Sequence, residues 1–325
     1  NELIDKYGVN IKHFFDYYPI TGKIMRSGDG NYYGIVPIII ESSKWMSNYF
    51  VARKDWMDDL GINPPNTLDE WVAMLKAFRD QDANGDGNPS NEIPWGSPPE
   101  FFGEAFGLHL WASAWQGGFF TDENGKVYYQ YTDPRYKDFL TFSNMLYKEK
   151  LLDPDYANPS AESLQAKATK NLVGSMNMWP DLAIGWGKLL RASVDDDAAF
   201  MPLPPPTGPN GDQSIEGYGS VDMGFAGISK DCKNPEAAIK IMDYMWSEEG
   251  RLFLAYGIEG KTYKMEDDKP VYTDEVLNNK EGLGPSDVLR TYGAWPTIPW
   301  VQQENSYIQQ LEADPLWEKA AGTCL

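Results

Sequence analysis

Apolar residues at helical spacing alternate with short extended runs along this chain. The clearest helix begins after two prolines, where Thr67 and Glu70 form a capping box that satisfies two backbone amides at the helix start. The apolar side chains that follow recur on one helical face, at Leu68, Trp71, Leu75 and Phe78. This helix leads directly into a loop of very different composition.

Further helices are predicted from apolar spacing and from terminal signals. They span residues 101–115, 136–150 and 161–169, from Asn234 to about residue 250, and from about residue 302 onward. Asn234 suits the N-cap position, and Pro235 suits the first turn. The predicted core faces are Tyr136, Phe139, Leu140, Leu146 and Tyr147 in one helix and Ala238, Ile241, Met242 and Met245 in another.

Extended apolar runs predict strands between these helices. The strands are expected at residues 32–40, 48–53, 127–131, 173–179 and 224–229. The run at 173–179 ends in a tryptophan followed by Pro180, which places side chains at the edge of a sheet. Residues 201–211 predict a proline-rich loop, and the charged residues 263–287 predict an irregular surface segment. Strands that alternate with helices indicate an α/β fold.

Composition restricts the class of protein. The chain has 325 residues, of which 42% are hydrophobic and 23% charged, as expected for about two globular domains. Its 28 Lys and Arg against 48 Asp and Glu give a net charge of -20, which excludes nucleic acid as a partner. No apolar run is long enough to span a bilayer, so any membrane link must lie outside this sequence.

The acidic loop, residues 82–94, carries the pattern of a calcium-binding loop. Asp82, Asn84 and Asp86 offer side-chain oxygens at alternate positions, and the glycine that follows permits the turn that aims the Asn88 carbonyl inward. An EF-hand would carry glutamate at its twelfth position, whereas Glu92 comes one residue earlier. Prolines after the loop exclude a second helix there, so calcium would stabilise only the helix that precedes the loop. The alternative is an ordinary solvated Asx/Gly turn.

Other reactive chemistry has little support in the sequence. His13 and His109 stand apart from any nucleophile or zinc spacing, and no phosphate-binding glycine motif is present. With 48 acidic residues, a pair of carboxylates at glycosidase spacing remains open. Cys232 and Cys324 match no metal-ligand spacing, and whether they pair is also open.

An aromatic surplus of 12 Trp, 19 Tyr and 14 Phe suggests a carbohydrate ligand, because sugar rings present apolar faces that stack on flat side chains. Most of these rings are expected to pack in the core. Trp179, Trp295 and Trp300 each stand beside proline at an element boundary, where loops line binding sites. With Asp181 and Trp186, they form the predicted ligand-binding set.

The order of these features resembles a known family, the extracellular solute-binding proteins of ABC importers. The resemblance is closest to the large lipoprotein branch of Gram-positive bacteria, which is similar to alginate-binding and maltose-binding proteins. The matching segments are residues 53–61 with 67–71, the acidic loop, 146–149 with 152–154, 233–238 with 247–250, and 256–260. Together they cover nearly the whole chain.

The resemblance implies a two-lobe periplasmic-binding-protein-like fold of type II, with ligand held between lobes that close as a hinge. The expected lobes are 1–50 with 226–290, and 51–225 with 291–325, the second lobe carrying the acidic loop. Family members also have opening strands of the first lobe and a lipid-anchored cysteine that this sequence does not include. Part of the first lobe is therefore expected to be missing from this chain.

Site residues also follow from the resemblance. Trp179 ends the strand whose terminal tryptophan stacks on sugar in maltose-binding relatives, and Trp295 or Trp300 is the matching late aromatic. Where the family completes its calcium cage with an Asp-Glu pair, this chain has Asn91 and Glu92 displaced by one residue. The resemblance therefore adds Asn91 to the predicted calcium ligands and implies weaker calcium binding.

The sequence thus predicts a non-enzymatic, monomeric substrate-binding component of an ABC importer. It would bind carbohydrate, deliver it to the permease membrane subunits, hold a structural calcium ion, and sit outside the cell on a lipid anchor. A glycoside hydrolase and a calcium-stabilised surface adhesion module are the alternatives. The particular sugar is not predictable, although a uronate would require basic groups such as Arg53, Lys54 or Arg191.

Overall fold

A computed structural model describes most of the chain. The described residues are 1–35, 38–39, 48–111, 117–121, 124–158, 160–213, 226–281, 283–295, 301–302, 306, 309–311 and 314–321. Contacts divide the chain into two compact units, each made of two segments. The first unit is Asn1–Trp45 with Tyr218–Ala313, and the second is Met46–Gly217 with Asp314–Leu325. The expected lobes differ from these units mainly at residues 291–313, which group with the first unit.

A four-stranded mixed sheet organises the second unit, in the order β3-β6-β2-β7. Its strands are β2 (Tyr49–Arg53), β3 (Ile93–Trp95), β6 (Val173–Met178) and β7 (Phe200–Leu203). β6 is parallel to β3, whereas β2 is antiparallel to both β6 and β7. The strands β3, β6 and β7 therefore all end at one edge of the sheet, and β2 begins there. We call this the carboxyl edge.

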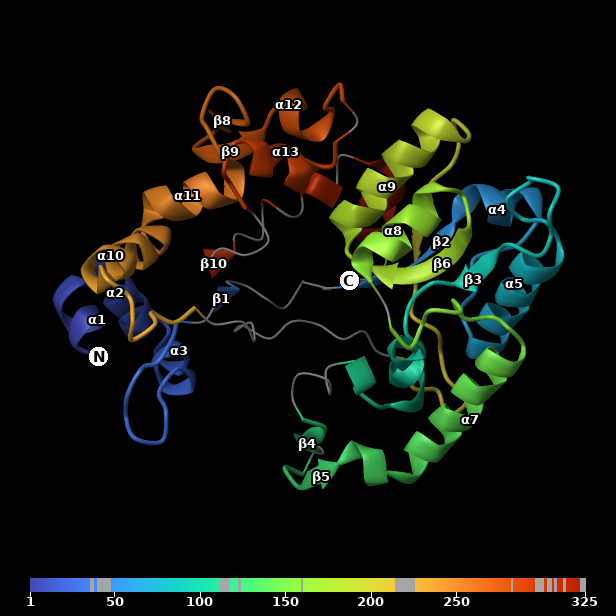
Figure 1. Cartoon of the computed structure of the whole chain (residues 1–325), viewed down its shortest axis with the longest axis horizontal. Coiled ribbons are helices and arrows are strands. Elements are labelled where there is room, and N and C mark those ends of the chain that lie inside the picture. Colours follow the sequence, from blue (N-terminus) through green and yellow to red (C-terminus); the bar gives the residue numbers. More distant parts are fainter. Residues whose placement is uncertain are drawn as a thin grey trace. The chain divides into compact units, whose positions relative to one another are not determined.

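Helices cover both faces of this sheet (Figure 1). They are α4 (Lys54–Asp59), α5 (Leu68–Asp80), α8 (Ala161–Thr169) and α9 (Pro180–Ser193). The capping box predicted at Thr67 and Glu70 is confirmed, and all four predicted apolar residues of α5 are buried. A Cβ at Gly174 of β6 would lie 2.5 Å from the Phe78 ring and 2.7 Å from the Trp56 ring. Glycine is required here because α4 and α5 approach the strand so closely.

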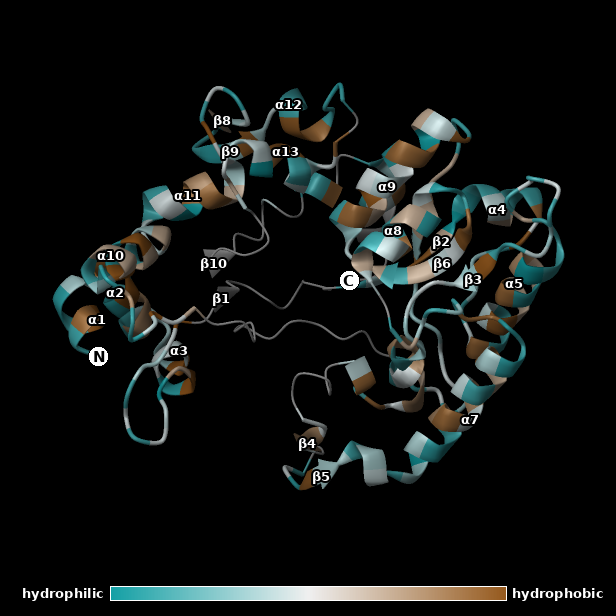
Figure 2. Cartoon of the chain, viewed as in Figure 1, coloured by the Kyte–Doolittle hydropathy of each residue, from teal (hydrophilic) through white to brown (hydrophobic). Residues whose placement is uncertain are grey.

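The second unit contains further elements, of which α15 packs on β7 and on Tyr49 of β2. They are the 3₁₀ helix η2 (Pro99–Phe106), β4 (Phe119–Thr121), β5 (Val127–Tyr129), η3 (Gln130–Thr132), α7 (Pro134–Lys148) and α15 (Pro315–Ala321). Of the helix expected at residues 101–115, the first part is a 3₁₀ helix that Gly107 terminates in the left-handed conformation, with φ 64°, and residues 112–115 lie outside the described residues. Leu140 and Tyr147 of α7 are exposed, so their predicted burial was wrong. Bands of polar and apolar residues along α7 are visible in Figure 2.

Helices from the two ends of the first unit pack together around Ile11, Phe14, Ile239 and Trp246. The helices are α1 (Glu2–Tyr7), α2 (Val9–Tyr17), α3 (Pro19–Ile24), α10 (Pro235–Met245) and α11 (Glu248–Tyr256). Ile241 is exposed, so its predicted place in the core face of α10 was wrong. Ile239, which was not predicted, is buried there instead. Two short strands, β1 (Ile38–Ile39) and β10 (Val301–Gln302), pair in parallel.

Residues 263–281 and 283–287 lie largely at the surface, as the charged sequence predicts, but they include regular helices and strands that the sequence did not indicate. They contain the hairpin of β8 (Tyr263–Glu266) and β9 (Lys269–Tyr272), followed by α12 (Asp274–Leu277) and α13 (Pro285–Thr291). The turn places Asp267 and Asp268 at φ 48° and 59°. Two-residue hairpin turns usually contain Asn or Gly. An Asp-Asp pair is not typical of such a turn, so the sequence did not predict the hairpin. Tyr263, Tyr272 and Val276 are buried in a small core.

Two further findings concern the described part of the chain. None of its helices combines the length and apolar character that a bilayer span requires. Cys232 is a free thiol, whereas Cys324 lies outside the described residues.

Candidate functional site

The carboxyl edge of the sheet is the strongest candidate for ligand binding. Ligands of open α/β sheets bind beyond the carboxyl ends of parallel strands, because loops there are free to vary while the strands hold them in place. Here β6 ends at Met178, opposite Tyr49 at the start of β2. Trp179 follows at once, and its backbone forms the N-cap of α9 with no side-chain capping bond. The Trp179 side chain is half-buried.

Asp181 and Trp186 follow Trp179 in α9 and were predicted with it. Asp181 lies in the first turn, where the helix dipole stabilises a carboxylate, and is only 7% exposed. Trp186 is also only 7% exposed. Its burial favours a packing role beneath the edge, and Trp179 is the more accessible ring for stacking. The predicted cluster in the second unit therefore centres on Trp179.

Two polar residues at this edge escaped the sequence analysis. Ser97 follows β3, and its hydroxyl donates to the Asn177 carbonyl at 3.1 Å and accepts from the Asn177 amide at 2.9 Å. The Asn177 side-chain oxygen is buried and accepts no hydrogen bond from the described residues. A buried acceptor without a donor is costly, and a ligand hydroxyl would satisfy it. The available signal was a polar Asn in an apolar strand, next to Trp179.

The late aromatic residues belong to the first unit. Trp295 follows α13 and is 43% exposed, with the Arg290 guanidinium 5.1 Å from its ring centre. Trp300 lies outside the described residues. Exposure leaves the Trp295 ring accessible to a ligand, but nothing in the first unit alone assigns it that role.

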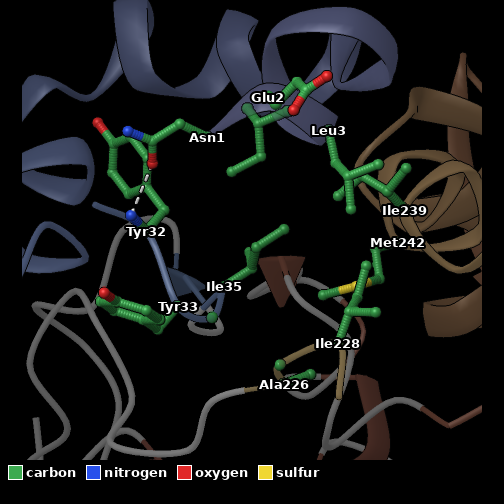
Figure 3. A pocket seen from close by; sticks show the side chains of 13 residues that line it. Asn1, Glu2, Leu3, Tyr32, Tyr33, Ile35, Ala226, Ile228, Ile239 and Met242 are labelled. Carbon is green, nitrogen blue, oxygen red and sulfur yellow. Dashed lines mark hydrogen bonds between the residues drawn. The ribbon is translucent and has the colours of Figure 1, made fainter. Parts of the chain in front are cut away.

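A cavity of about 240 Å³ in the first unit is mostly apolar (Figure 3). Leu3, Ile35, Ile239 and Met242 project into it, and the backbone amide of Tyr32 donates to the Asn1 side chain at 2.8 Å nearby. Aliphatic walls offer few hydrogen bonds to sugar hydroxyls, so this cavity is a poor carbohydrate site.

The acidic loop lies at the opposite edge of the sheet, since its oxygen-bearing residues 82–92 come directly before β3. Its side chains are held by local bonds. The Asp82 carboxylate accepts the Gly87 amide at 3.1 and 3.2 Å, and the Asp86 carboxylate accepts the Asn88 amide at 2.8 Å and the Asn91 side chain at 2.6 Å. The predicted calcium ligands are thus gathered in one turn. That turn is well separated along the strands from Trp179.

Glu92 is the exception within the loop. Both of its carboxylate oxygens are buried, and neither has a hydrogen-bond partner among the residues that the structure describes. Burial is the largest influence and raises the pKa of Glu92. The backbone amides of Glu92 and Asn84 lower this pKa in part, while the nearby charges of Asp82 and Asp86 raise it. A buried carboxylate beside two others is unfavourable unless a cation joins them.

The donor set fits calcium in its chemistry, because calcium takes about six to eight oxygen ligands from carboxylates, amides and carbonyls. In the described part of the chain, however, no three His, Cys, Asp or Glu side chains are close enough to form a metal cluster. Asp82 and Asp86 instead bond backbone amides, as in an ordinary Asx turn. Calcium binding therefore stays a prediction, supported by the buried carboxylate of Glu92.

A chain of hydrogen bonds ties the acidic loop to the core. Asn171, in the left-handed conformation at φ 64°, donates to the Asn84 carbonyl at 3.0 Å. Its side-chain oxygen accepts from Arg53 at 2.5 Å and lies 3.4 Å from the Trp56 ring nitrogen. Arg53 is fully buried and also bonds Asp55 through both branches of its guanidinium. Order in the loop is thus linked to the packing of β2 and α4.

The basic residues proposed for a uronate have other partners. Arg53 ends β2 at the opposite edge, Lys54 pairs with Asp58, and Arg191 lies 3.8 Å from Asp314. None of these three residues lies at the carboxyl edge of the strands.

The two histidines differ in their surroundings. His109 makes a 2.8 Å contact through Nδ1 with the buried carboxyl of Glu104, so it is not isolated as the sequence suggested. Gln130 fixes its backbone with bonds of 3.0 and 3.1 Å. His13 is exposed and stacks on Tyr17 at 6.3 Å.

Replacing Glu92 with glutamine is expected to raise the melting temperature of the calcium-free protein and to weaken calcium binding by about tenfold or more. The amide removes a buried charge that calcium would otherwise neutralise. Thermal unfolding with and without calcium, and a calcium titration, measure both effects. The exposed Glu100→Gln serves as control. A calcium-free Glu92→Gln protein that melts lower than the parent would contradict this account of the loop.

The fold and the carboxyl edge together define a class, the two-unit α/β binding proteins. A family model described as bacterial extracellular solute-binding protein matches residues 15–252. The chain belongs to this family. The expected two-lobe α/β fold is confirmed by its match to solved solute-binding proteins.

Individual relatives are distant. The chain is 26% identical over 242 residues to the lipoprotein LipO of Bacillus subtilis, covering 72% of this chain and 47% of LipO. It is 27% identical over 268 residues to the fructooligosaccharide ABC transporter substrate-binding protein FusA of Streptococcus pneumoniae, covering 76% of this chain and 46% of FusA. The chain thus spans about half the length of the curated relatives it matches.

Solved structures that resemble this chain belong to the same class of binding protein. The alginate-binding protein AlgQ2, solved without calcium ion, superposes with a TM-score of 0.77 at 26% identity, over 100% of this chain and 66% of that chain. FusA of S. pneumoniae in complex with kestose gives 0.68 at 21% identity, over 98% of this chain and 66% of that chain. The second likeness supports the fold alone.

Proposed function

We propose that this chain is part of the substrate-binding component of an ABC importer and that it captures an oligosaccharide. Family membership supports a binding role, and the names of FusA and AlgQ2 support a carbohydrate ligand. The observation that carries the proposal is the carboxyl edge, where a half-buried Trp179 follows the unsatisfied side-chain oxygen of Asn177.

Each residue of the edge has a part in the proposed binding. A sugar ring stacks its apolar face on Trp179, because rings with polarised C–H groups suit aromatic faces. Asn177 accepts one sugar hydroxyl, and Asp181 accepts another at the start of α9. Trp186 supports this surface from beneath. Trp295 in the first unit is the candidate for a second aromatic contact, with Trp300 beside it in sequence.

The proposal includes the setting of the protein. The chain delivers its ligand to the permease subunits, acts as a monomer without chemical turnover, and is held outside the cell by a lipid anchor carried on a part of the protein beyond this sequence. The family description and the lipoprotein name of LipO support the extracellular setting.

We also propose that the acidic loop holds a structural calcium ion. The ligands are Asp82, Asn84, Asp86, the Asn88 carbonyl, Asn91 and Glu92. The buried oxygens of Glu92 support the proposal, as does the reference to calcium in the name of the AlgQ2 structure. Because the loop lies at the edge opposite Trp179, the ion has a stabilising role and does not touch the ligand.

A thermal-shift screen against a panel of oligosaccharides, in calcium and in chelator, tests the proposed function. One class of oligosaccharide is expected to raise the melting temperature by a few degrees, since a ligand at about 100 times its Kd adds about 2.7 kcal/mol of stability. Free monosaccharides and amino acids serve as controls. A panel in which peptides shift the melting temperature and no carbohydrate does so would reject a carbohydrate ligand.

A further inference from the structure

A second pocket lies in the first unit, on the helices α2 and α11. It has a volume of about 250 Å³ and is lined by His13, Phe14, Tyr17, Tyr18 and Arg251. Four of its five walls are aromatic rings, and the fifth is a guanidinium group. The volume is just below the range of about 300–1,000 Å³ that accommodates drug-sized ligands. The pocket therefore suits one small ring.

The walls of the pocket are fixed by packing. The ring of Phe14 lies edge-on to the buried Trp246 at 5.1 Å, and stacks with Tyr18 at 6.1 Å. Tyr17 meets Tyr18 at 4.7 Å in a T-shaped contact and is 68% exposed. A rigid floor of aromatic rings with an exposed tyrosine at the rim is a preorganised surface for a flat or ring-shaped ligand.

Arg251 has too few partners for its position. Its Nε donates to the Ser247 carbonyl at 3.3 Å, and its guanidinium lies 5.2 Å from the centre of the Phe14 ring. Among the described residues no carboxylate forms an ion pair with it, although Glu248 acts on it from a distance. Arg251 is half-buried, and this burial lowers the pKa of its guanidinium. A desolvated cation without an anion is costly, and an anionic ligand would offset that cost.

We infer that this pocket is a second carbohydrate site, selective for a sugar that carries a carboxylate. The guanidinium has donors at two terminal nitrogens, which match the two oxygens of a carboxylate in a bidentate pair. The ring of a hexuronate would lie against Tyr17, with its carboxylate at Arg251. This site belongs to the first unit, whereas Trp179 belongs to the second. It therefore does not rest on the function proposed for the carboxyl edge.

Nuclear magnetic resonance locates such a site directly, because the chain has only two histidines. Galacturonate is titrated into the Trp179→Ala protein, so that the carboxyl edge makes no contribution. The His13 imidazole resonance is expected to shift in a saturable way, while the His109 resonance stays in place. Galactose, which lacks the carboxylate, is expected to leave both unchanged.

Variants separate the charge from the fold. Arg251→Met keeps the apolar stem over Phe14 and is expected to weaken galacturonate binding by about tenfold or more, because it removes a charge-assisted pair. Arg251→Lys keeps the positive charge but loses the planar pair of guanidinium donors. Its affinity for galacturonate is expected to lie between those of the parent protein and Arg251→Met. Arg26→Met is a matched control, since Arg26 also covers an aromatic ring, that of Tyr32, at 5.1 Å. Melting temperatures confirm that each variant is folded.

Three results would overturn the inference. Equal binding of galactose and galacturonate would remove the role of the carboxylate. Unchanged galacturonate binding in a folded Arg251→Met protein would remove the role of the guanidinium. Inorganic phosphate that displaces galacturonate at equal concentration would show a simple anion site with no preference for a sugar ring.

Discussion

Replacing Trp179 with alanine is expected to weaken oligosaccharide binding by about 30-fold, because aromatic anchors at the centre of a binding site contribute about 2 kcal/mol or more. The change should leave the fold intact. Trp179 is half-buried, makes no side-chain capping bond to α9, and stands after the last residue of β6. Isothermal titration with the best oligosaccharide of the panel measures the loss of affinity.

The control for Trp179→Ala is Tyr147→Ala, which removes another accessible ring of the same unit. Tyr147 is 59% exposed near the end of α7 and packs against Tyr156 at 6.0 Å. The Tyr147→Ala protein is expected to bind the oligosaccharide with the affinity of the parent protein. A 30-fold loss in Tyr147→Ala together with normal binding in Trp179→Ala would move the ligand away from the carboxyl edge.

Saturating calcium is expected to raise the melting temperature of the chain by about 5–10 °C. A ligand at about 100 times its Kd stabilises the folded state by about 2.7 kcal/mol, and each kcal/mol shifts the melting temperature by about 2–4 °C in a chain of this size class. Asp86→Asn is expected to abolish most of this shift, because it removes one of the three carboxylates that the ion would join. Scanning calorimetry with calcium and with chelator measures it.

Two further variants make the calcium experiment specific. Asp138→Asn removes an exposed carboxylate from α7 and should retain the full calcium shift. Asn171→Ala leaves every proposed calcium ligand in place but removes the bond to the Asn84 carbonyl. It is expected to lower the melting temperature with and without calcium, because Arg53 and the loop lose their shared partner. A melting temperature of the parent protein that is the same in calcium and in chelator would show that the acidic loop is an ordinary turn.

Features encoded within a few residues could be predicted from the sequence. The capping box of α5 places Thr67 and Glu70 three positions apart, and the acidic loop gathers its oxygens within one turn. The strand that ends at Trp179 was equally visible, because Pro180 marks its end and begins α9. In each case the residues that interact are also neighbours in the chain.

Features that depend on residues far apart in the chain were not predictable. Ser97 meets Asn177 across 80 positions, and Asn171 reaches Asn84 across 87. A polar Asn in an apolar strand marks Asn177 as unusual, but only the folded sheet shows that its side-chain oxygen is buried without a donor among the described residues. The location of the acidic loop relative to Trp179 also required the sheet, because only the strand directions place them at opposite edges.

The two edges lie at opposite ends of the strands, and we propose that one stabilises the second unit while the other binds ligand. The acidic loop, Asn171 and the buried Arg53 stabilise one end of the sheet. At the other end, Ser97 and Asn177 bond to each other where β3 and β6 finish, next in sequence to the half-buried Trp179. Variants at Trp179 should therefore change ligand affinity, and variants in the acidic loop should change the melting temperature.

The most direct test of the central claim is a calorimetric titration of the calcium-loaded protein with an oligosaccharide from the panel, followed by recovery of the sugar. The account predicts saturable binding with one ligand per chain and an oligosaccharide recovered intact after prolonged incubation. Release of new reducing ends would instead identify a glycoside hydrolase. Absence of binding to every oligosaccharide, in a protein that remains folded, would contradict the assignment of a carbohydrate ligand.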